Sequence, residues 1–255
     1  MKRVLVAMLL AVPGFACAQP LLEFRDDLAF SGSEVAAQGV HAYGARLRTL
    51  SMAGKLDPDP GLKARLQRIV PRLLRAAAYE RPAAGRLAWE VHACTGCDEN
   101  ASALPGGKLL VSADFVARHR LTDAELAYLV SHEIAHVLAE HAREFATAAR
   151  YFMDNGLARR YWDIQQELDE SLPVALRMQP LEEQQELEAD YMGFLLGARA
   201  GFEPEAMLGL LGKLESGSGI VRSHPSGQRR IAQARAMLDA ARRLLQSAQR
   251  QNPGR

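Results

Sequence analysis

The sequence predicts an α+β fold in which helices dominate. Two or three short strands in the first half are followed by helical periodicity alone, which is typical of α+β domains. The 255 residues are 48% hydrophobic and 24% charged, so the chain can bury a sizeable core. The formal net charge of +1 creates no field that would attract nucleic acid, and we expect no nucleic-acid partner.

The N-terminal residues 1–18 are typical of a secretory signal peptide. Two basic residues precede a short apolar run at 4–12, and the small residues 16–18 suit a signal peptidase. We therefore expect cleavage after Ala18 and a mature chain in the periplasm. A lipoprotein acylated at Cys17 is the alternative. No later apolar run is long enough to span a bilayer, so we expect no transmembrane segment.

The segment after the signal peptide predicts two helices and then two strands. Apolar residues recur at helical spacing in two segments that a run of Asp and Pro separates, and they alternate with polar residues further on. The turn Pro105-Gly106-Gly107 precedes the second strand. The predicted helices span 34–53 and 61–78, and the predicted strands span Leu87–Ala93 and Lys108–Ser112.

All of the chain beyond the second strand has helical periodicity. The predicted helices span about 113–119, 122–142, 144–171, 180–198, 203–214 and 228–249. The Ser/Gly segment 216–219 predicts a flexible linker before His224. We expect residues 19–255 to form a single domain, in which the helices of about 34–78 pack on a catalytic core of about 85–250.

Two cysteines remain after the expected cleavage, and they lie close together as Cys94-Thr95-Gly96-Cys97. In an oxidising compartment a disulfide is the expected state of this pair. A redox-active dithiol is disfavoured because no βαβ pattern surrounds it. A structural zinc site would need two more ligands, and His92 is the one nearby candidate.

The strongest chemical signal is an HExxH motif that runs from His132 to His136. A capping box of Thr122 and Glu125 predicts the start of its helix. The two histidines lie one turn apart on one face, opposite an apolar stripe. Neutral imidazoles at this spacing suit Zn²⁺, and Glu133 is placed to take a proton from the attacking water. The alternative is a surface helix with incidental histidines.

A catalytic zinc ion generally takes three protein ligands and leaves one position open. We predict Glu186 as the third ligand, because Asp190 and two glycines share its helix face and the glycines permit close approach. Asp190 would accept the second ring N–H of a ligating histidine. The alternative is a solvated acidic face. His141 lies on the opposite side of the helix from His132, and we interpret it as a core or supporting histidine.

Together these motifs resemble metallopeptidase family forty-eight over about residues 60–235. This gluzincin family includes HtpX, the CAAX prenyl protease, BepA and LoiP. The resemblance implies a zincin-like catalytic domain with the HExxH motif on the active-site helix. It also implies one Zn²⁺ per chain held by three of these residues, with a general base and a supporting carboxylate. The matching segments are 132–136, 186–190, the edge-strand segment 100–107, His141 and the segment 223–229.

Residue by residue, the resemblance assigns His132, His136 and Glu186 as metal ligands, Glu133 as general base and Asp190 as the supporting carboxylate. It implies that His141 is not a ligand. Without membrane spans or a tetratricopeptide domain, the chain resembles a minimal, soluble, periplasmic form of the family.

His224 is a second candidate catalytic residue. The flexible linker would bring it over the metal, where it would stabilise the oxyanion. Two alternatives remain: His224 occupies the open coordination position and keeps the enzyme latent, or it is an ordinary loop histidine beside Pro225. We expect Arg229 to anchor this loop by pairing with an acid.

Two segments are candidates for contact with substrate. The strand Lys108–Ser112, interpreted as an edge strand, would bind an extended peptide by β-addition, which favours unfolded polypeptides. Aromatic residues recur at near-helical spacing within 145–179, and we interpret them as core rather than as a lid or substrate platform. They are Tyr151, Phe152, Tyr161 and Trp162.

The sequence thus predicts a periplasmic zinc metalloendopeptidase that acts on unfolded or misfolded envelope proteins, outer-membrane proteins among them, in protein quality control. The alternative is a latent, His224-capped protein that binds unfolded outer-membrane proteins as a chaperone does. Zinc storage is disfavoured because the chain has no His-rich tract. Such a ligand set also accepts Co²⁺ or Mn²⁺.

Overall fold

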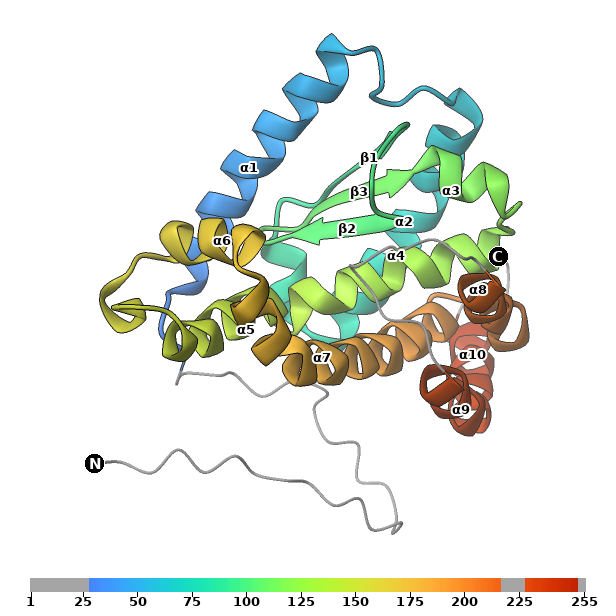
Figure 1. Ribbon diagram of the computed structural model, residues 1–255. Coiled ribbons are helices and arrows are strands. Elements are labelled where there is room, and N and C mark those ends of the chain that lie inside the picture. The colour runs from blue at the N-terminus through green and yellow to red at the C-terminus, as the bar shows by residue number, and fades with distance from the viewer. Residues whose placement is uncertain (1–27, 217–227, 252–255) are drawn as a thin grey trace, which may run out of the picture.

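The computed structural model describes residues 28–216 and 228–251 and confirms the helix-dominated α+β fold (Figure 1). Three short 3-10 helices, at Pro82–Arg86, Arg150–Phe152 and Gly156–Ala158, connect the longer elements. The strands are β1 (Glu90–Cys94), β2 (Ala101–Leu104) and β3 (Lys108–Ser112). The helices are α1 (Gly32–Met52), α2 (Pro60–Glu80), α3 (Ala113–Arg118), α4 (Asp123–Leu138), α5 (His141–Ala149), α6 (Tyr161–Glu170), α7 (Leu172–Arg199), α8 (Pro204–Ser216), α9 (Gln228–Ala236) and α10 (Leu238–Gln251).

The three strands form one small sheet in the order β1-β3-β2. β1 runs parallel to β3, with Glu90 opposite Lys108, and β2 runs antiparallel to it, with Ala101 opposite Val111. The interpretation of Lys108–Ser112 as an edge strand is therefore wrong, because both of its edges are paired. β2, which comes from the predicted edge-strand segment 100–107, is an edge strand of the sheet.

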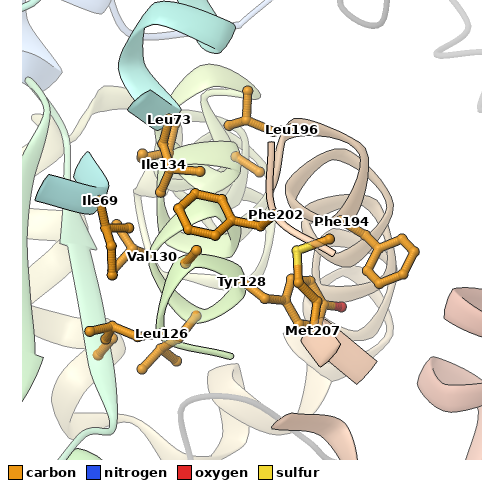
Figure 2. Packing of buried hydrophobic residues seen from close by; sticks show 14 of the residues in the cluster. Ile69, Leu73, Leu126, Tyr128, Val130, Ile134, Phe194, Leu196, Phe202 and Met207 are labelled. Atoms are coloured by element: carbon orange, nitrogen blue, oxygen red, sulfur yellow. The ribbon is translucent and has the colours of Figure 1, made fainter. Parts of the chain in front are cut away.

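Helices α4 and α7 run side by side beneath the sheet (Figure 1). Their closest approach is at Gly193, where an added Cβ would lie 2.7 Å from the backbone nitrogen of His132. The Ser131 hydroxyl donates to the Gly193 carbonyl at 2.8 Å across the same contact. The pair is held from the sides by α2 and α8, in the main apolar cluster (Figure 2). Figure 2 labels Ile69, Leu73, Leu126, Tyr128, Val130, Ile134, Phe194, Leu196, Phe202 and Met207.

The start of α4 is as predicted, and its end is not. The Glu125 carboxylate accepts from the Thr122 backbone N–H at 2.7 Å, and the Thr122 hydroxyl accepts from the Glu125 N–H at 3.3 Å. The helix ends at Leu138 because Glu140 adopts a left-handed conformation with φ 57°. A new helix, α5, then begins at His141, so this histidine does not continue the face of α4.

The predicted helix 144–171 is also divided. Asn155 has φ 52°, and Gly156 lies so close to the Arg150 carbonyl that a Cβ would be 2.1 Å from its oxygen. By contrast α7 is longer than predicted and continues through Pro180, because its first half buries Val174 and Met178. The predicted helix 228–249 breaks near Met237 into α9 and α10.

A second, smaller apolar cluster joins α1 to α5, α6 and the first half of α7. The core interpretation of the aromatic segment is right for Tyr161, which is buried in this cluster. It is wrong for Tyr151, Phe152 and Trp162, which are 66%, 42% and 46% exposed. The buried members of the cluster are Phe30, Val35, Ala146, Ala149, Met153, Tyr161, Ile164, Val174 and Met178.

Cys94 and Cys97 form the predicted disulfide. Asp114 holds the residues between them, since its carboxylate accepts from the Thr95 hydroxyl at 2.7 Å and from the Gly96 N–H at 2.6 Å. In the part of the chain that the structure describes, no helix is long and apolar enough to cross a membrane. The predicted signal peptide and Cys17 lie outside these residues.

Candidate metal centre

The packing of α4 against α7 brings the three predicted ligands together. Nε2 of His132 lies 3.0 Å from Nε2 of His136. The Glu186 carboxylate meets both rings, with Oε2 at 3.4 Å from His132 Nε2 and Oε1 at 3.2 Å from His136 Nε2. Two imidazoles and one carboxylate therefore converge on one point, although His132 and Glu186 lie 54 positions apart in the sequence.

The geometry of these donors fits a zinc ion. Tetrahedral Zn²⁺ with bonds of about 2.0–2.1 Å places its ligand atoms about 3.3–3.4 Å apart. The measured separations are 3.0, 3.2 and 3.4 Å. Gly193 allows this convergence, because any side chain at its position would push α7 away from the backbone of His132. Three protein ligands also leave a fourth position open, as in catalytic zinc sites.

Asp190 lies behind His132, one turn of α7 beyond Glu186. Its Oδ1 is 3.0 Å from His132 Nδ1, the ring nitrogen that faces away from Glu186. Arg230, from α9, donates to both Asp190 oxygens at 2.5 and 2.7 Å, and the Tyr128 hydroxyl donates to Oδ1 at 3.1 Å. The carboxylate is thus fixed from three sides and holds the His132 ring in place.

The charges around His132 favour its protonated form. Burial lowers the pKa of this imidazole, but the Glu186 charge and the bonds to Asp190 and Glu186 outweigh burial and raise the pKa to about 10. Burial and the nearby His132 charge lower the pKa of His136 to about 3. Burial raises the pKa of Asp190, but its bonds to Arg230 and His132 hold that pKa at about 2. A metal ion would therefore replace a proton between His132 and Glu186.

His141 lies against His136, outside the cluster formed by His132, His136 and Glu186. Its Nδ1 lies 2.8 Å from Nδ1 of His136, and its Nε2 lies 3.5 Å from Oε2 of Glu188. His141 is buried, and the left-handed turn at Glu140 brings it back to the centre. When His136 Nε2 faces a metal, His136 Nδ1 carries the ring proton and donates a hydrogen bond to Nδ1 of His141. The sequence alone left open whether His141 supports a ligand or simply fills the core.

Glu133 lies beside the three ligands and faces a cavity of about 430 Å³. The carboxylate is buried, and it shares the cavity wall with His136 and Glu186. β2 forms another part of the wall, and residues of α1 and α5 also line the cavity. A cavity of this size holds a short stretch of an extended peptide. Peptide hydrolysis needs an acid–base group, a metal site and a substrate cavity next to one another, and these residues provide that arrangement.

His224 lies outside the described residues, so its proposed role stays a prediction. The anchoring role expected of Arg229 is wrong by one position. Arg229 is exposed, whereas Arg230 is buried and pairs with Asp190 and with Glu186, the latter at 3.5 Å. Successive residues of a helix point about 100° apart, and which face of α9 packs against α7 could not be read from the sequence.

Comparison with known proteins agrees with this geometry. The model of peptidase family M48 matches residues 60–238. The mitochondrial metalloendopeptidase OMA1 of Arabidopsis thaliana is 33% identical over 163 residues, which cover 60% of this chain and 33% of the relative. OMA1 of Schizosaccharomyces pombe is 30% identical over 165 residues, 61% of this chain and 48% of the relative. OMA1 of Saccharomyces cerevisiae is 25% identical over 211 residues, which cover 76% of this chain and 61% of the relative. The chain spans less than two thirds of each relative.

The names of these relatives contradict the predicted location. Each is called mitochondrial, which points to mitochondria rather than to the periplasm. The periplasmic prediction depended on two basic residues, a short apolar run and small residues near position 18. That pattern reports a charged and apolar N-terminus, and by itself it does not identify a compartment.

Proposed function

Because this chain belongs to peptidase family M48, we propose that it is a zinc-dependent metalloendopeptidase. The observation that carries the proposal is the convergence of His132, His136 and Glu186 beside Glu133, at the wall of a cavity. The relatives, which are named metalloendopeptidases, support the same reaction class. In this proposal His132, His136 and Glu186 hold the metal, and Asp190 and His141 orient the two histidines.

The chemistry that a zinc ion supplies at such a site is polarisation of the scissile carbonyl and a lowered pKa of water. The protein supplies the proton transfers. Glu133 follows His132 on α4, and its buried carboxylate faces the cavity, where it accepts a proton from the attacking water. The same carboxyl group then returns the proton to the leaving amine. His224 is proposed to stabilise the oxyanion, as the sequence predicted.

The cavity favours extended, unfolded polypeptides as substrates. Ala101, Ser102 and Ala103 of β2 line it, and β2 is an edge strand whose one strand partner among the described residues is β3. A peptide that adds to an edge strand binds through main-chain hydrogen bonds, which need little side-chain selectivity. A folded protein does not present such a segment, so we propose that unfolded or misfolded chains are cleaved.

The test is digestion of unfolded casein by the purified protein loaded with zinc. We expect fragments that increase with time, loss of cleavage after chelation and recovery when zinc is restored. Absence of cleavage by a protein with one bound zinc per chain would contradict the proposal. It would favour the chaperone alternative if the protein also suppressed client aggregation and the Glu133→Gln variant did so equally well.

A further inference from the structure

We propose that helix α1 determines substrate specificity by forming one wall of a subsite for a large apolar side chain of the substrate, next to the scissile bond. This inference rests on the proposed peptidase function and extends it to the substrate class. The residues that carry it are Val35 and Ala36, together with the small residues that line the same cavity.

α1 is not part of the segment that the family has in common. The family model begins at residue 60, whereas α1 spans Gly32–Met52. Nevertheless Val35 and Ala36 line the same cavity as Glu133 and His136. Figure 1 shows the first turns of α1 close to α6 and to the end of β2, at the margin of the sheet. A helix outside the segment that the family model matches therefore bounds the site at which the proposed chemistry would take place.

The middle of α1 is fixed on the turn between β2 and β3. The buried Tyr43 hydroxyl donates to the Leu109 carbonyl of β3 at 2.9 Å. At Gly39, an added Cβ would lie 2.3 Å from the Pro105 carbonyl oxygen, so the helix backbone lies directly against the turn. Gly106, with φ 87°, approaches the Ala36 carbonyl in the same way. These contacts hold α1 at a constant position relative to β2.

The residues just before α1 are fixed separately on α5. Arg143 of α5 donates to the carbonyl of Phe30, and the Ala29 N–H donates to the Thr147 hydroxyl at 3.2 Å. The Phe30 ring packs edge-on against Tyr161, with ring centres 5.5 Å apart. Val35 is buried in the same apolar cluster. With contacts at two separate places, α1 is a rigid wall, and the size of its side chains sets the space beside it.

The side chains around this space define the chemistry of the subsite. Many of them are apolar, and several are small, so the space is left for the substrate to fill. Charged side chains also line the cavity, but they pair within the protein, Glu140 with Arg143 and Glu99 with Arg46. A charged substrate side chain placed there would lose its hydration and compete with these pairs, whereas a large apolar one would gain by burial. We therefore assign a large apolar residue, such as Leu or Phe, to this position of the substrate. The apolar residues in question are Val35, Ala36, Ala101, Ala103, Val137 and Phe145.

The experiment compares two tryptophan substitutions at neighbouring alanines of α1. Ala36 lines the cavity, and Ala37 is exposed, so Ala37→Trp is a matched control of the same residue type. Quenched fluorescent peptides that differ only in Leu, Phe, Ala or Asp beside the cleaved bond give kcat/KM for each variant. Ala36→Val, a smaller change, is measured in parallel in case Ala36→Trp does not fold.

We expect the unmodified protein and Ala37→Trp to prefer Leu and Phe over Ala and Asp. We expect Ala36→Trp to lower the Leu-to-Ala preference by about tenfold or more, and Ala36→Val to lower it less. An unchanged preference in a folded, zinc-loaded Ala36→Trp protein would overturn the inference, although the proposed function would stand.

A second readout does not depend on turnover. In the zinc-loaded Glu133→Gln background, the same peptides are titrated and their binding is followed by fluorescence anisotropy. We expect Ala36→Trp to weaken binding of the Leu peptide and leave the Ala peptide almost unchanged. Equal weakening of both peptides, or of neither, would overturn the assignment of the subsite. If no zinc-loaded protein cleaves any peptide, the proposed function fails, whereas cleavage with an unchanged preference is a failure of the inference alone.

Discussion

Nδ1 of His141 lies 2.8 Å from Nδ1 of His136, on the side of the ring away from Glu186. His141 in turn approaches the Glu188 carboxylate at 3.5 Å. Glu188, His141 and His136 thus form a chain of contacts that leads to the metal centre. Asp190 has the same relation to His132, at 3.0 Å. Each proposed imidazole ligand thus has its own orienting partner, and each partner fixes which ring nitrogen faces the metal.

Replacing His141 with phenylalanine is expected to weaken metal binding. Phenylalanine fills a similar space but accepts no hydrogen bond from His136, so the tautomer of the His136 ring is no longer fixed. Loss of such partners generally costs about 10–100-fold in metal affinity. Competition with a chromophoric zinc chelator measures the Kd. His41→Phe, at an exposed position on α1, is the control, and equal affinities for the two variants would show that His141 has no orienting role.

Arg230→Ala is expected to destabilise the protein strongly, because it leaves the buried Asp190 carboxylate without its two strongest bonds. Removal of one partner of a buried ion pair generally costs about 3–5 kcal/mol. The neighbouring Arg229→Ala changes an exposed residue and should alter stability by no more than about 0.5 kcal/mol. Urea denaturation of both variants without metal tests this contrast, and similar midpoints would refute it.

Gly193→Ala is expected to separate α7 from α4. The new Cβ would lie 2.7 Å from the His132 nitrogen, so the helices must move and the ligands with them. We expect a loss of about 1–3 kcal/mol of stability, as for other overpacked cores, together with weaker zinc binding. Gly212→Ala, in α8, meets no atom within 4 Å and should stabilise the protein by up to about 1 kcal/mol. Should both variants gain stability, the close contact would be disproved.

Asp57 predicts a pH dependence of stability that is independent of the metal. Burial raises the pKa of its carboxyl, but bonds from the Ala93 N–H, His92 and Lys63 outweigh burial and hold the pKa below its ordinary value of 3.8. When the pKa of a carboxyl is lower in the folded state than in the unfolded state, its charge stabilises the fold. This stabilisation is fully present above the unfolded-state pKa and is lost as the pH falls through the folded-state pKa.

Asp57→Asn should therefore be less stable than the unmodified protein at pH 7, and the gap should close as the pH is lowered below 3.8. Thermal denaturation at a series of pH values measures the gap. Asp98→Asn, at an exposed position near the same disulfide, serves as the control. A gap that stays constant down to the acid limit would contradict the assigned role of the Asp57 charge.

The parts of the fold that the sequence predicts well depend on local signals. The strand Lys108–Ser112 has the predicted bounds, and the capping box at Thr122 marks the start of α4. The three proposed ligands could be selected because their spacing on two helices is a local pattern. Asp190 followed from the same helical period, one turn beyond Glu186.

The remaining features depend on contacts between distant segments. The pairing of β3 on both edges and the passage of α7 through Pro180 are decided by tertiary packing. The left-handed residue Glu140 ends a helix for which the local pattern gave no stop signal. The choice between Arg229 and Arg230 depends on which face of α9 packs against α7. Nor did any local pattern indicate that α1 lines the same cavity as Glu133 and His136, which lie about 100 positions further along the chain.

The central claim is that Glu133 moves the proton in a reaction at a metal held by His132, His136 and Glu186. The most direct measurement compares the Glu133→Gln variant with the unmodified protein, for zinc content by mass spectrometry and for cleavage of unfolded casein. The account predicts one zinc ion per chain in both proteins, with cleavage by the unmodified protein and none by Glu133→Gln. A zinc-loaded Glu133→Gln protein that still cleaves casein would contradict it.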